Sequence, residues 1–528
     1  MLTYLISHLP NLAATAAGVL CARKLLHYFQ LESYQFHGYF KTIRRQWKRA
    51  ILPPIALGIL FLLLSKAGNA LYSAAAPQRI WKLICIMGVV SGAMIALGVA
   101  VSILLSKGKE KKPFVVTARM KRLYGILCAV LLVFCWITPA HVLLLPLLVA
   151  LAALIALPIE KGIQRMYMRD AQRRMDAQPG LIRIGITGSY GKTSVKNILY
   201  TILSQKYNVL STPASFNTPM GLTRVIRERL EPAHQVFLAE MGARHRKDIR
   251  ELTDFIHPTI GVLTSVGPQH LDTFKTLDNI IATKYDLIRA IPPDGFAVFN
   301  DDHGICADLY EKTLNTPKAI VNRKGGDVWA ENIEVTAQGS SFQLCFSDGE
   351  TLPCQTRMLG AHNISNILLA CAVAKRLGLS NTQIQRGISQ LVPVEHRLQL
   401  LKSAGGVTVI DDAFNSNPAG AKAALNVLSR FPGRRIIVTP GMVELGDKEA
   451  EFNRDLGREM ASAADICVLI GKKHTQPIQE GLLNAGYPAQ DIHVFPSLND
   501  ATAWLQGFMR AGDFILYEND LPDHYTET

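Results

Sequence analysis

Several features that define common protein classes are absent from the sequence. It contains no C-x-x-C pair and no histidine tract, which excludes a zinc ribbon. Its cysteines follow no framework spacing, so we expect reduced thiols packed as small apolar side chains rather than disulfides. The sequence has no repeat of solenoid period and no low-complexity tract. The nine cysteines are Cys21, Cys85, Cys128, Cys135, Cys306, Cys345, Cys354, Cys371 and Cys467.

Acidic residues are scarce in the first third of this 528-residue chain. Residues 1–176 contain 22 Lys and Arg against 5 Asp and Glu, whereas the rest contains 34 and 37. The formal net charge of +14 therefore arises from the N-terminal part. Positive charge between apolar segments indicates membrane lipids with anionic headgroups as partners and argues against nucleic acid.

Long apolar runs fill the same part of the chain, and each is near the length that crosses a bilayer. The first run is interrupted by His8, Pro10 and Asn11, and it lacks the basic start of a cleavable signal peptide, so we expect it in the mature protein. The last two runs are separated only by residues 138–141, so we predict five spans, with four as the alternative. The runs are 4–22, 51–72, 81–106, 122–138 and 141–158.

The basic residues indicate how these runs are oriented, because Lys and Arg are retained on the cytoplasmic side. They cluster in segments 21–50, 107–122 and 161–174, whereas segment 66–82 has only three and 138–141 has none. This alternation predicts a multi-pass protein of the bacterial cell membrane with an external N-terminus and everything after residue 160 in the cytoplasm. A buried helical domain of a soluble protein is the alternative.

After residue 180 the pattern changes to short β-branched runs that alternate with amphipathic stretches, which is typical of α/β units. We therefore predict a multi-domain chain: an N-terminal α-helical transmembrane domain (1–176), a central α/β P-loop domain (177–395) and a C-terminal α/β Rossmann-like domain (396–528). The predicted strands are 181–186, 235–241, 260–266, 295–299, 406–411, 435–439, 466–470 and 513–517, with short strands within 327–357; the predicted helices are 192–206, 276–290 and two within 362–390.

A phosphate-binding loop follows the first of these strands. Residues 187–194 read T-G-S-Y-G-K-T-S and run directly into a predicted helix. Backbone N–H groups and a helix N-terminus suit an anion, while Lys192 would meet the β- and γ-phosphates of a nucleotide and Thr193 would reach Mg²⁺. Ile186 stands where the general motif has its first glycine. The predicted nucleotide-binding residues of this loop are Gly188, Ser189, Gly191, Lys192, Thr193 and Ser194.

The T-G-S-x-G-K-T form resembles the phosphate loop of the Mur ligase family, and further family-like motifs follow in order. They read S-F-N-T-P-M-G at 215–221, E-M-G-A at 240–243 and T-S-V-G-P-Q-H-L at 264–271. The resemblance implies that Asn217 and Thr218 face the acceptor substrate. It also implies two magnesium ions, with ligands from Thr193, Glu240, His270 and Lys284.

Lys284 falls where the resemblance implies a lysine carbamylated by CO₂, which turns a cation into an oxygen donor for the second magnesium. Lys192, Lys284 and His270 are the catalytic residues that the resemblance implies. Asn300 in F-N-D-D would meet adenine. The remaining nucleotide-binding residues it implies are His362 and Asn363 of G-A-H-N-I-S-N, Arg397 at the start of the last domain, and Asp411.

The C-terminal motifs resemble the branch of the family that adds D-alanyl-D-alanine. They are D-D-A-F-N-S-N-P at 411–418, whose Asn415 and Asn417 would contact substrate, and G-M-V-E-L-G at 441–446. Two departures put the substrates in doubt. The phosphate loop follows the apolar segments so closely that no UDP-sugar-binding domain precedes it, and residues 512–520 do not match the K-G-S-R type sequence of that branch.

The resemblance implies an ATP-dependent amide ligase. ATP would phosphorylate a carboxylate to an acyl phosphate, and an amine would displace phosphate. The expected acceptor is a cell-wall precursor with a free carboxylate, either lipid-linked or UDP-linked, and the amine is an amino acid or dipeptide. The alternatives are a membrane-tethered polyglutamate-type ligase and a membrane scaffold or transporter driven by ATP hydrolysis.

Overall fold

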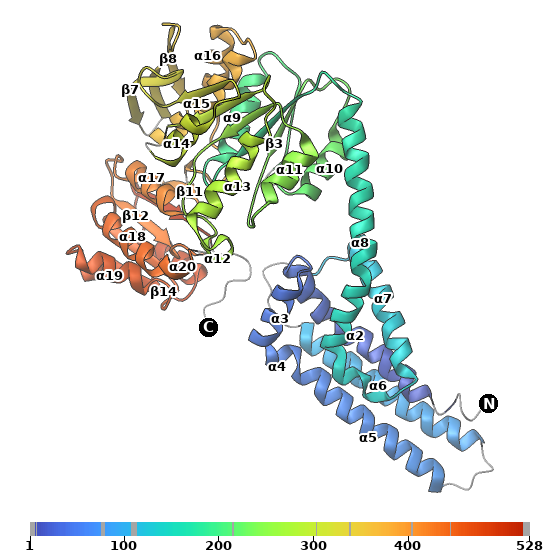
Figure 1. Cartoon of the computed structure of the whole chain (residues 1–528). Coiled ribbons are helices and arrows are strands. Elements are labelled where there is room, and N and C mark those ends of the chain that lie inside the picture. The colour runs from blue at the N-terminus through green and yellow to red at the C-terminus, as the bar shows by residue number, and fades with distance from the viewer. Residues whose placement is uncertain are drawn as a thin grey trace. The chain divides into compact units, whose positions relative to one another are not determined.

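The computed structural model describes residues 6, 8–74, 80–106, 113–213, 216–301, 304–336, 339–402, 405–414, 416–443 and 445–520 (Figure 1). The chain divides into two compact units, Met1–Met166 and Tyr167–Thr528. The long helix α8 begins in the first unit and ends in the second, so each unit is described by itself.

The first unit is helical, and its helices approach closely where side chains are small. A Cβ on Gly98 of α6 would lie 2.3 Å from the Ala17 side chain of α2, and the Cys21 thiol donates to the Gly98 carbonyl at 3.5 Å. Such contacts are typical of helices packed in a membrane. The helices are α2 (Leu9–Leu31), α3 (Phe36–Arg45), α4 (Trp47–Ala50), α5 (Leu52–Ala74), α6 (Ile80–Ser106), α7 (Ala118–Cys135), η1 (Pro139–Leu144) and α8 (Leu145–Asp176).

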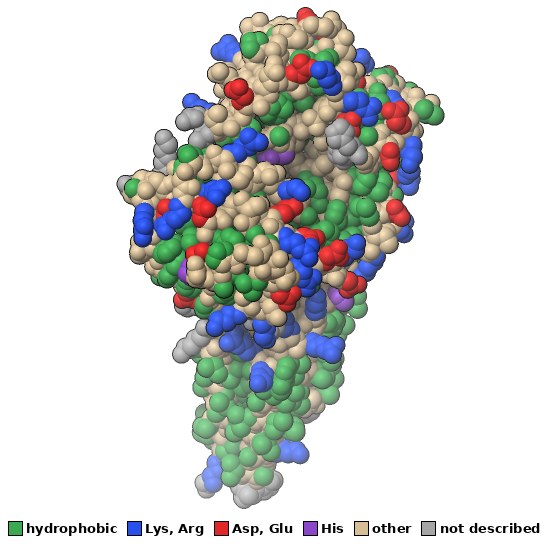
Figure 2. All heavy atoms as spheres, turned by 90° about the vertical axis from the view of Figure 1, so that its left-hand side faces the viewer, with side chains coloured by type: hydrophobic (Ala, Val, Ile, Leu, Met, Phe, Trp, Pro, Cys, Tyr) green, Lys and Arg blue, Asp and Glu red, His purple; other side chains and the backbone are tan. Residues whose placement is uncertain are grey.

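Within the described residues, three helices are long and apolar enough to cross a membrane: Trp47–Leu71, Trp81–Leu105 and Ala140–Asp176. Hydrophobic side chains cover the visible face of the first unit, and Lys and Arg side chains gather at its ends (Figure 2). The other two predicted spans, 4–22 and 122–138, overlap α2 and α7, and residues 4, 5 and 7 of the first lie outside the described residues. Polar residues in α2 and the basic first turn of α7 reduce their apolar length, so three of the five predicted spans meet the requirements of length and composition.

A nine-stranded sheet forms the centre of the second unit, with the order β2-β3-β1-β4-β5-β6-β7-β8-β9. The first seven of these strands pair in parallel, and β8 and β9 extend the sheet as an antiparallel meander. The strands are β1 (Ile182–Thr187), β2 (Val209–Ser211), β3 (Val236–Glu240), β4 (Ile260–Leu263), β5 (Phe296–Asn300), β6 (Lys318–Val321), β7 (Val328–Thr336), β8 (Gly339–Phe346) and β9 (Thr351–Thr356).

Helices cover both faces of this sheet, so its parallel strands are apolar on both sides. One core joins the strands to α9, α15 and α16, and the other joins them to α10, α11, α13, α14 and the end of α8 (Figure 1). The helices are α9 (Lys192–Leu203), α10 (Pro219–Arg229), α11 (Asp248–Ile256), α12 (Leu271–Phe274), α13 (Leu277–Arg289), α14 (Ile305–Lys312), α15 (Ala361–Arg376) and α16 (Asn381–Ser389).

A second, six-stranded sheet follows, with the order β10-β11-β15-β12-β13-β14. All its pairings are parallel except β10 with β11, and helices pack on it through two further cores. Its elements are β10 (Gln399–Lys402), β11 (Thr408–Asp412), α17 (Pro418–Leu428), β12 (Arg435–Thr439), η2 (Gly446–Lys448), α18 (Glu449–Ala463), β13 (Ile466–Ile470), α19 (Gln476–Asn484), η3 (Ala489–Asp491), β14 (Ile492–Phe495), α20 (Leu498–Phe508) and β15 (Phe514–Glu518).

The cysteines behave as expected from their spacing. All nine are free, seven are buried, Cys128 is partly buried and Cys85 is exposed. Burial raises the pKa of the Cys354 and Cys467 thiols to about 12. The protein therefore holds seven of its nine cysteines as buried apolar groups.

Candidate active site

The phosphate loop connects β1 to α9, and its two glycines are required by their surroundings. Gly188 has a φ of +154°, and a Cβ there would lie 2.0 Å from the Thr264 hydroxyl. Gly191 caps α9 in the left-handed region with a φ of +82°, where a Cβ would lie 2.7 Å from Asn366 of α15. The segment after β4 therefore bounds the phosphate loop on one side, and α15 bounds it on the other.

Replacing Gly188 with alanine is expected to weaken nucleotide binding by at least about tenfold, because the added Cβ displaces the loop from Thr264. Gly180→Ala is the matched control, since a Cβ on Gly180 meets no atom within 4 Å. Titration of both variants with a fluorescent ADP analogue measures the effect. Equal affinity in the two variants would contradict the assigned role of the loop.

The segment after β4 braces the phosphate loop through hydrogen bonds. The Ser189 backbone N–H donates to the Ser265 carbonyl at 2.6 Å, and its hydroxyl donates to the Gly267 carbonyl at 2.9 Å. The Tyr190 hydroxyl donates to the Pro268 carbonyl at 2.9 Å. The loop is thus held in shape by contacts within the protein, which is the preorganisation that anion binding requires.

Lys192 lies at the first position of α9 and folds back over the loop. Its ammonium donates to the Gly188 carbonyl at 2.7 Å and to the Ser189 carbonyl at 3.0 Å. Burial, opposed by Glu240 and reinforced by the Arg397 charge, lowers the pKa of Lys192 to about 8. A cation held in this setting gains most from an incoming phosphate.

Glu240, at the end of β3, is the centre of the site. Its Oε1 accepts hydrogen bonds from the Thr193 hydroxyl at 3.1 Å and the Asn217 amide at 3.2 Å, and its Oε2 lies 3.0 Å from Lys196 Nζ. Neighbouring ligands of an octahedral Mg²⁺ lie about 2.9 Å apart, since Mg–O distances are about 2.05 Å. The Thr193 and Glu240 oxygens therefore fit one magnesium ion.

The described residues contain no group of three or more His, Cys, Asp or Glu side chains that could hold a metal ion. Magnesium commonly takes only one or two protein oxygens and completes its shell with phosphate and water. A site built on Thr193 and Glu240 is consistent with this preference. His270 lies at the start of α12 with a φ of +53°, and its backbone carbonyl accepts from the Thr273 and Phe274 N–H groups.

Lys284 of α13 is 2% exposed. Burial and the nearby Lys192 charge lower its pKa well below the usual value, and Asp248 opposes this shift. The neutral amine is the form that reacts with CO₂, so the surroundings favour the chemistry predicted for this side chain. Lys284 therefore lies close enough to Lys192 of the phosphate loop for the two charges to interact.

Arg397, just before β10, lies close enough to His362 of α15 and to Lys192 for its charge to act on both. Asn363 donates to the Leu359 carbonyl at 2.8 Å and so fixes the first turn of α15. Desolvation by the surrounding protein, reinforced by the Arg397 charge, lowers the pKa of His362. Arg397 interacts electrostatically with Asp412 and Glu240, and its guanidinium lies over the Phe414 ring, 4.4 Å from the ring centroid.

Acidic residues at the end of β11 hold this arginine segment. Asp411 accepts a hydrogen bond from His396 Nδ1 at 2.7 Å, and Asp412 accepts one from the Leu398 N–H at 3.2 Å. Burial raises the pKa of Asp412 to about 6 although Arg397 opposes the shift. Asp411 therefore contacts the segment that presents Arg397.

Some predicted residues have a local role in the structure. Thr218 caps α10 and Asn417 caps α17, each accepting from a backbone N–H. Asn300 ends β5, and its buried Oδ1 has no hydrogen-bond partner among the described residues, which leaves it an acceptor for a ligand. Ser194 is buried in the first turn of α9. Asn415 lies outside the described residues.

Glu518, the last residue of β15, and Asn519 after it belong to none of the motifs that the sequence contains. The buried Glu518 carboxylate accepts hydrogen bonds from the Ser416 and Thr439 hydroxyls, and Asn519 Oδ1 accepts from the Ser416 N–H at 2.9 Å. Asn519 Nδ2 donates to the Gly441 carbonyl. These two residues join the loops after β11 and β12, within the stretch 512–520 that departs from the family pattern.

The stability of this region is expected to depend on pH through Glu518. Burial raises its pKa to about 7 although Ser416 and Thr439 oppose the shift, so its contribution is fully present below the unfolded pKa and is lost as pH rises through 7. Hydrogen exchange of the β15 amides should show an opening free energy about 2 kcal/mol lower at pH 8 than at pH 5. Parallel pH profiles for the wild type and Glu518→Gln would contradict this.

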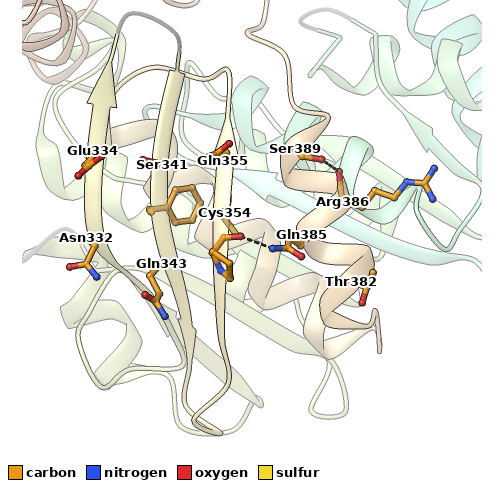
Figure 3. Close-up of a pocket in the computed structure, with 12 residues that line it drawn as sticks. Asn332, Glu334, Ser341, Gln343, Cys354, Gln355, Thr382, Gln385, Arg386 and Ser389 are labelled. Carbon is orange, nitrogen blue, oxygen red and sulfur yellow. Dashed lines mark hydrogen bonds between the residues drawn. The ribbon is translucent and has the colours of Figure 1, made fainter.

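A surface groove lies elsewhere in the second unit. It has a volume of about 660 Å³ and is lined by polar side chains of β7, β8, β9 and α16 (Figure 3). The Gln385 amide donates to the Pro353 carbonyl across it at 2.6 Å. No predicted site residue lines this groove, so volume alone does not locate the chemistry.

Comparison with known families agrees with this geometry. Residues 186–374 match the Mur ligase middle domain, and residues 396–517 match the Mur ligase, glutamate ligase domain. The chain belongs to the Mur ligase family. The multi-domain α/β fold with a helical N-terminal region is therefore confirmed, whereas the predicted domain boundaries stay predictions.

Within the family the chain is similar to UDP-N-acetylmuramoyl-tripeptide--D-alanyl-D-alanine ligases. It is 32% identical to that of Haemophilus influenzae, over 52% of this chain and 60% of the relative, and 31% identical to that of Synechocystis sp., over 63% and 71%. A crystal structure of MurF from Acinetobacter baumannii superposes with a TM-score of 0.63 and 28% identity, over 68% of this chain and 78% of that one. The match thus spans about three fifths of the Haemophilus relative.

Proposed function

We propose that this protein is an ATP-dependent amide ligase that joins an amine to the carboxylate of a peptidoglycan precursor. The proposal rests on the phosphate loop. Its Thr193 hydroxyl donates to Glu240, and its Lys192 lies close enough to Glu240, Lys284 and Arg397 for the charges to interact. The relatives named above add D-alanyl-D-alanine to a UDP-linked tripeptide. Their shared motifs support the same class of substrates here.

Each residue has a task that follows from its position. Lys192 neutralises charge on the phosphoryl group transferred from ATP to the acceptor carboxylate, and Arg397 suits the same phosphates because its guanidinium binds two oxygens at once. Thr193 and Glu240 would hold one magnesium ion. The oxygens of a carbamylated Lys284 would hold a second, with His270 as a further ligand. Magnesium supplies additional neutralisation of phosphate charge. Asn217, held in place by Glu240, would contact the acceptor substrate.

A turnover assay with ATP, D-alanyl-D-alanine and either a UDP-linked or a lipid-linked tripeptide tests this function. Formation of an amide product in step with phosphate release is the expected result. Phosphate release without any amide, for these and for other carboxylate acceptors, would instead support a switch driven by ATP hydrolysis. Addition of glutamate to a polyglutamate acceptor would support the polyglutamate alternative.

We further propose that the first unit lies in the cytoplasmic membrane and takes the place of a UDP-sugar-binding domain, so that the acceptor is lipid-linked. Three apolar helices and the basic residues between them support this. The measurement is kcat/KM of the intact protein in lipid vesicles for lipid-linked and soluble UDP-linked acceptors. A protein that uses only the soluble acceptor would show that the helices are a tether.

A further inference from the structure

Lys196 is a buried cation that none of the sequence motifs includes. It lies one helical turn after Lys192 on α9, and its side chain and that of Glu240 are each 1% exposed. The two form an ion pair with 3.0 Å between Lys196 Nζ and Glu240 Oε2. Removing two charges from water is costly, so a pair buried this completely at a reaction site calls for a role beyond stability.

The pair divides the two oxygens of Glu240 between two tasks. Oε2 is engaged by Lys196, whereas Oε1 faces the Thr193 hydroxyl and the Asn217 amide. A carboxylate is planar, so a contact that fixes one oxygen also fixes the direction of the other. The orientation of Oε1, the oxygen that fits a magnesium ion together with Thr193, therefore depends on Lys196.

We infer that Lys196 is a positioning residue that holds Glu240 for magnesium at the phosphate loop. The inference rests on the proposed function in one respect only, that a magnesium nucleotide binds there. Residues that orient the ligands of a metal commonly change its affinity by about 10- to 100-fold when they are replaced. Lys196 acts in this way through Glu240.

The sign of the effect separates this role from simple charge repulsion. A lysine near a metal site opposes the metal through its charge and favours it by orienting the ligand. If repulsion were the larger effect, removing the lysine would tighten magnesium binding. If orientation is the larger effect, removing it weakens magnesium binding, which is the result we expect.

The experiment uses the intact protein and a fluorescent ADP analogue, titrated with Mg²⁺ and separately in EDTA. For Lys196→Met, the Mg²⁺ concentration that half-saturates the metal-dependent gain in affinity should rise at least about tenfold. Affinity in EDTA should change by less than about threefold, because the phosphate loop is intact. Lys206→Met is the matched control: Lys206 lies just after α9 and donates to the Leu377 and Gly378 carbonyls, away from Glu240.

Three results would overturn the inference: an unchanged Mg²⁺ requirement, a lower one, or a loss of affinity in EDTA that equals the loss in Mg²⁺. The last would mean that Lys196 contacts the phosphates directly. If Lys196→Met does not fold, Glu240→Gln is compared with the double variant Glu240→Gln/Lys196→Met. The double variant leaves neither charge buried without its partner. The two should need the same Mg²⁺ concentration, and a further increase in the double variant would contradict action through Glu240.

These measurements use neither an acceptor nor an amine. A normal Mg²⁺ requirement in Lys196→Met would reject the inference and leave the proposed ligase function standing. Absence of amide product from the wild type, with magnesium-dependent nucleotide binding intact, would reject the ligase function and leave the role of Lys196 standing.

Discussion

Lys192→Ala is expected to lower the rate of amide formation by about a thousandfold or more. The variant removes the ammonium that the phosphate loop holds over its own carbonyl oxygens. Glu240→Ala should cause a loss of similar size, because Thr193 and Lys196 both depend on its carboxylate. Product formation, followed by mass spectrometry at saturating ATP, measures both variants.

Lys324→Ala is the control for Lys192→Ala. Its side chain is 84% exposed and pairs with Glu331, so it removes one positive charge from the same unit without touching the site. Its rate should stay within about twofold of the wild type, since exposed ion pairs contribute little. Near-normal turnover in Lys192→Ala would mean that the nucleotide site lies elsewhere in the chain.

Lys284→Ala is expected to be inactive, and short-chain carboxylates should partly restore it. The buried position and the low pKa of Lys284 favour a neutral amine that reacts with CO₂, and the resulting carbamate would supply oxygen to magnesium. Formate or acetate can enter the space left by the shortened side chain and supply the same kind of oxygen. The measurement is turnover across a titration of each carboxylate.

The matched control on the same helix is Arg289→Ala, whose side chain is 61% exposed and pairs with Asp286. It should retain activity and show no response to formate. A fully active Lys284→Ala enzyme would reject the carbamate. Loss of activity without any rescue, together with an intact-mass spectrum that shows no CO₂ adduct on the wild type, would make Lys284 an unmodified buried lysine.

The sequence predicted the elements of the α/β region well, because their hydrophobic patterns are local. The predicted strands 435–439 and 466–470 coincide with β12 and β13, and the predicted 276–290 helix is α13 within one residue at each end. The strands β2, β6, β10 and β14, each of three or four residues, were missed. Strands this short or this exposed carry too few apolar residues to form a pattern.

The phosphate loop and Glu240 could be predicted because motif residues adjoin one another in sequence. Lys196 and Glu518 could not, since their roles depend on contacts with residues 44 and 102 positions away. One signal for Lys196 was available: it follows Lys192 by four residues and therefore shares its helix face. For Glu518, nothing in the sequence marks the burial that raises its pKa.

The free cysteines make the two sheets of the second unit distinguishable in a single labelling experiment. Thiolate is the reactive form, so buried thiols with raised pKa values resist alkylation while the fold is intact. Cys354 lies in β9 and Cys467 in β13, so each becomes reactive only when its own sheet opens. Pulsed alkylation in increasing denaturant, read peptide by peptide, therefore reports the order in which the nine-stranded and six-stranded sheets lose structure.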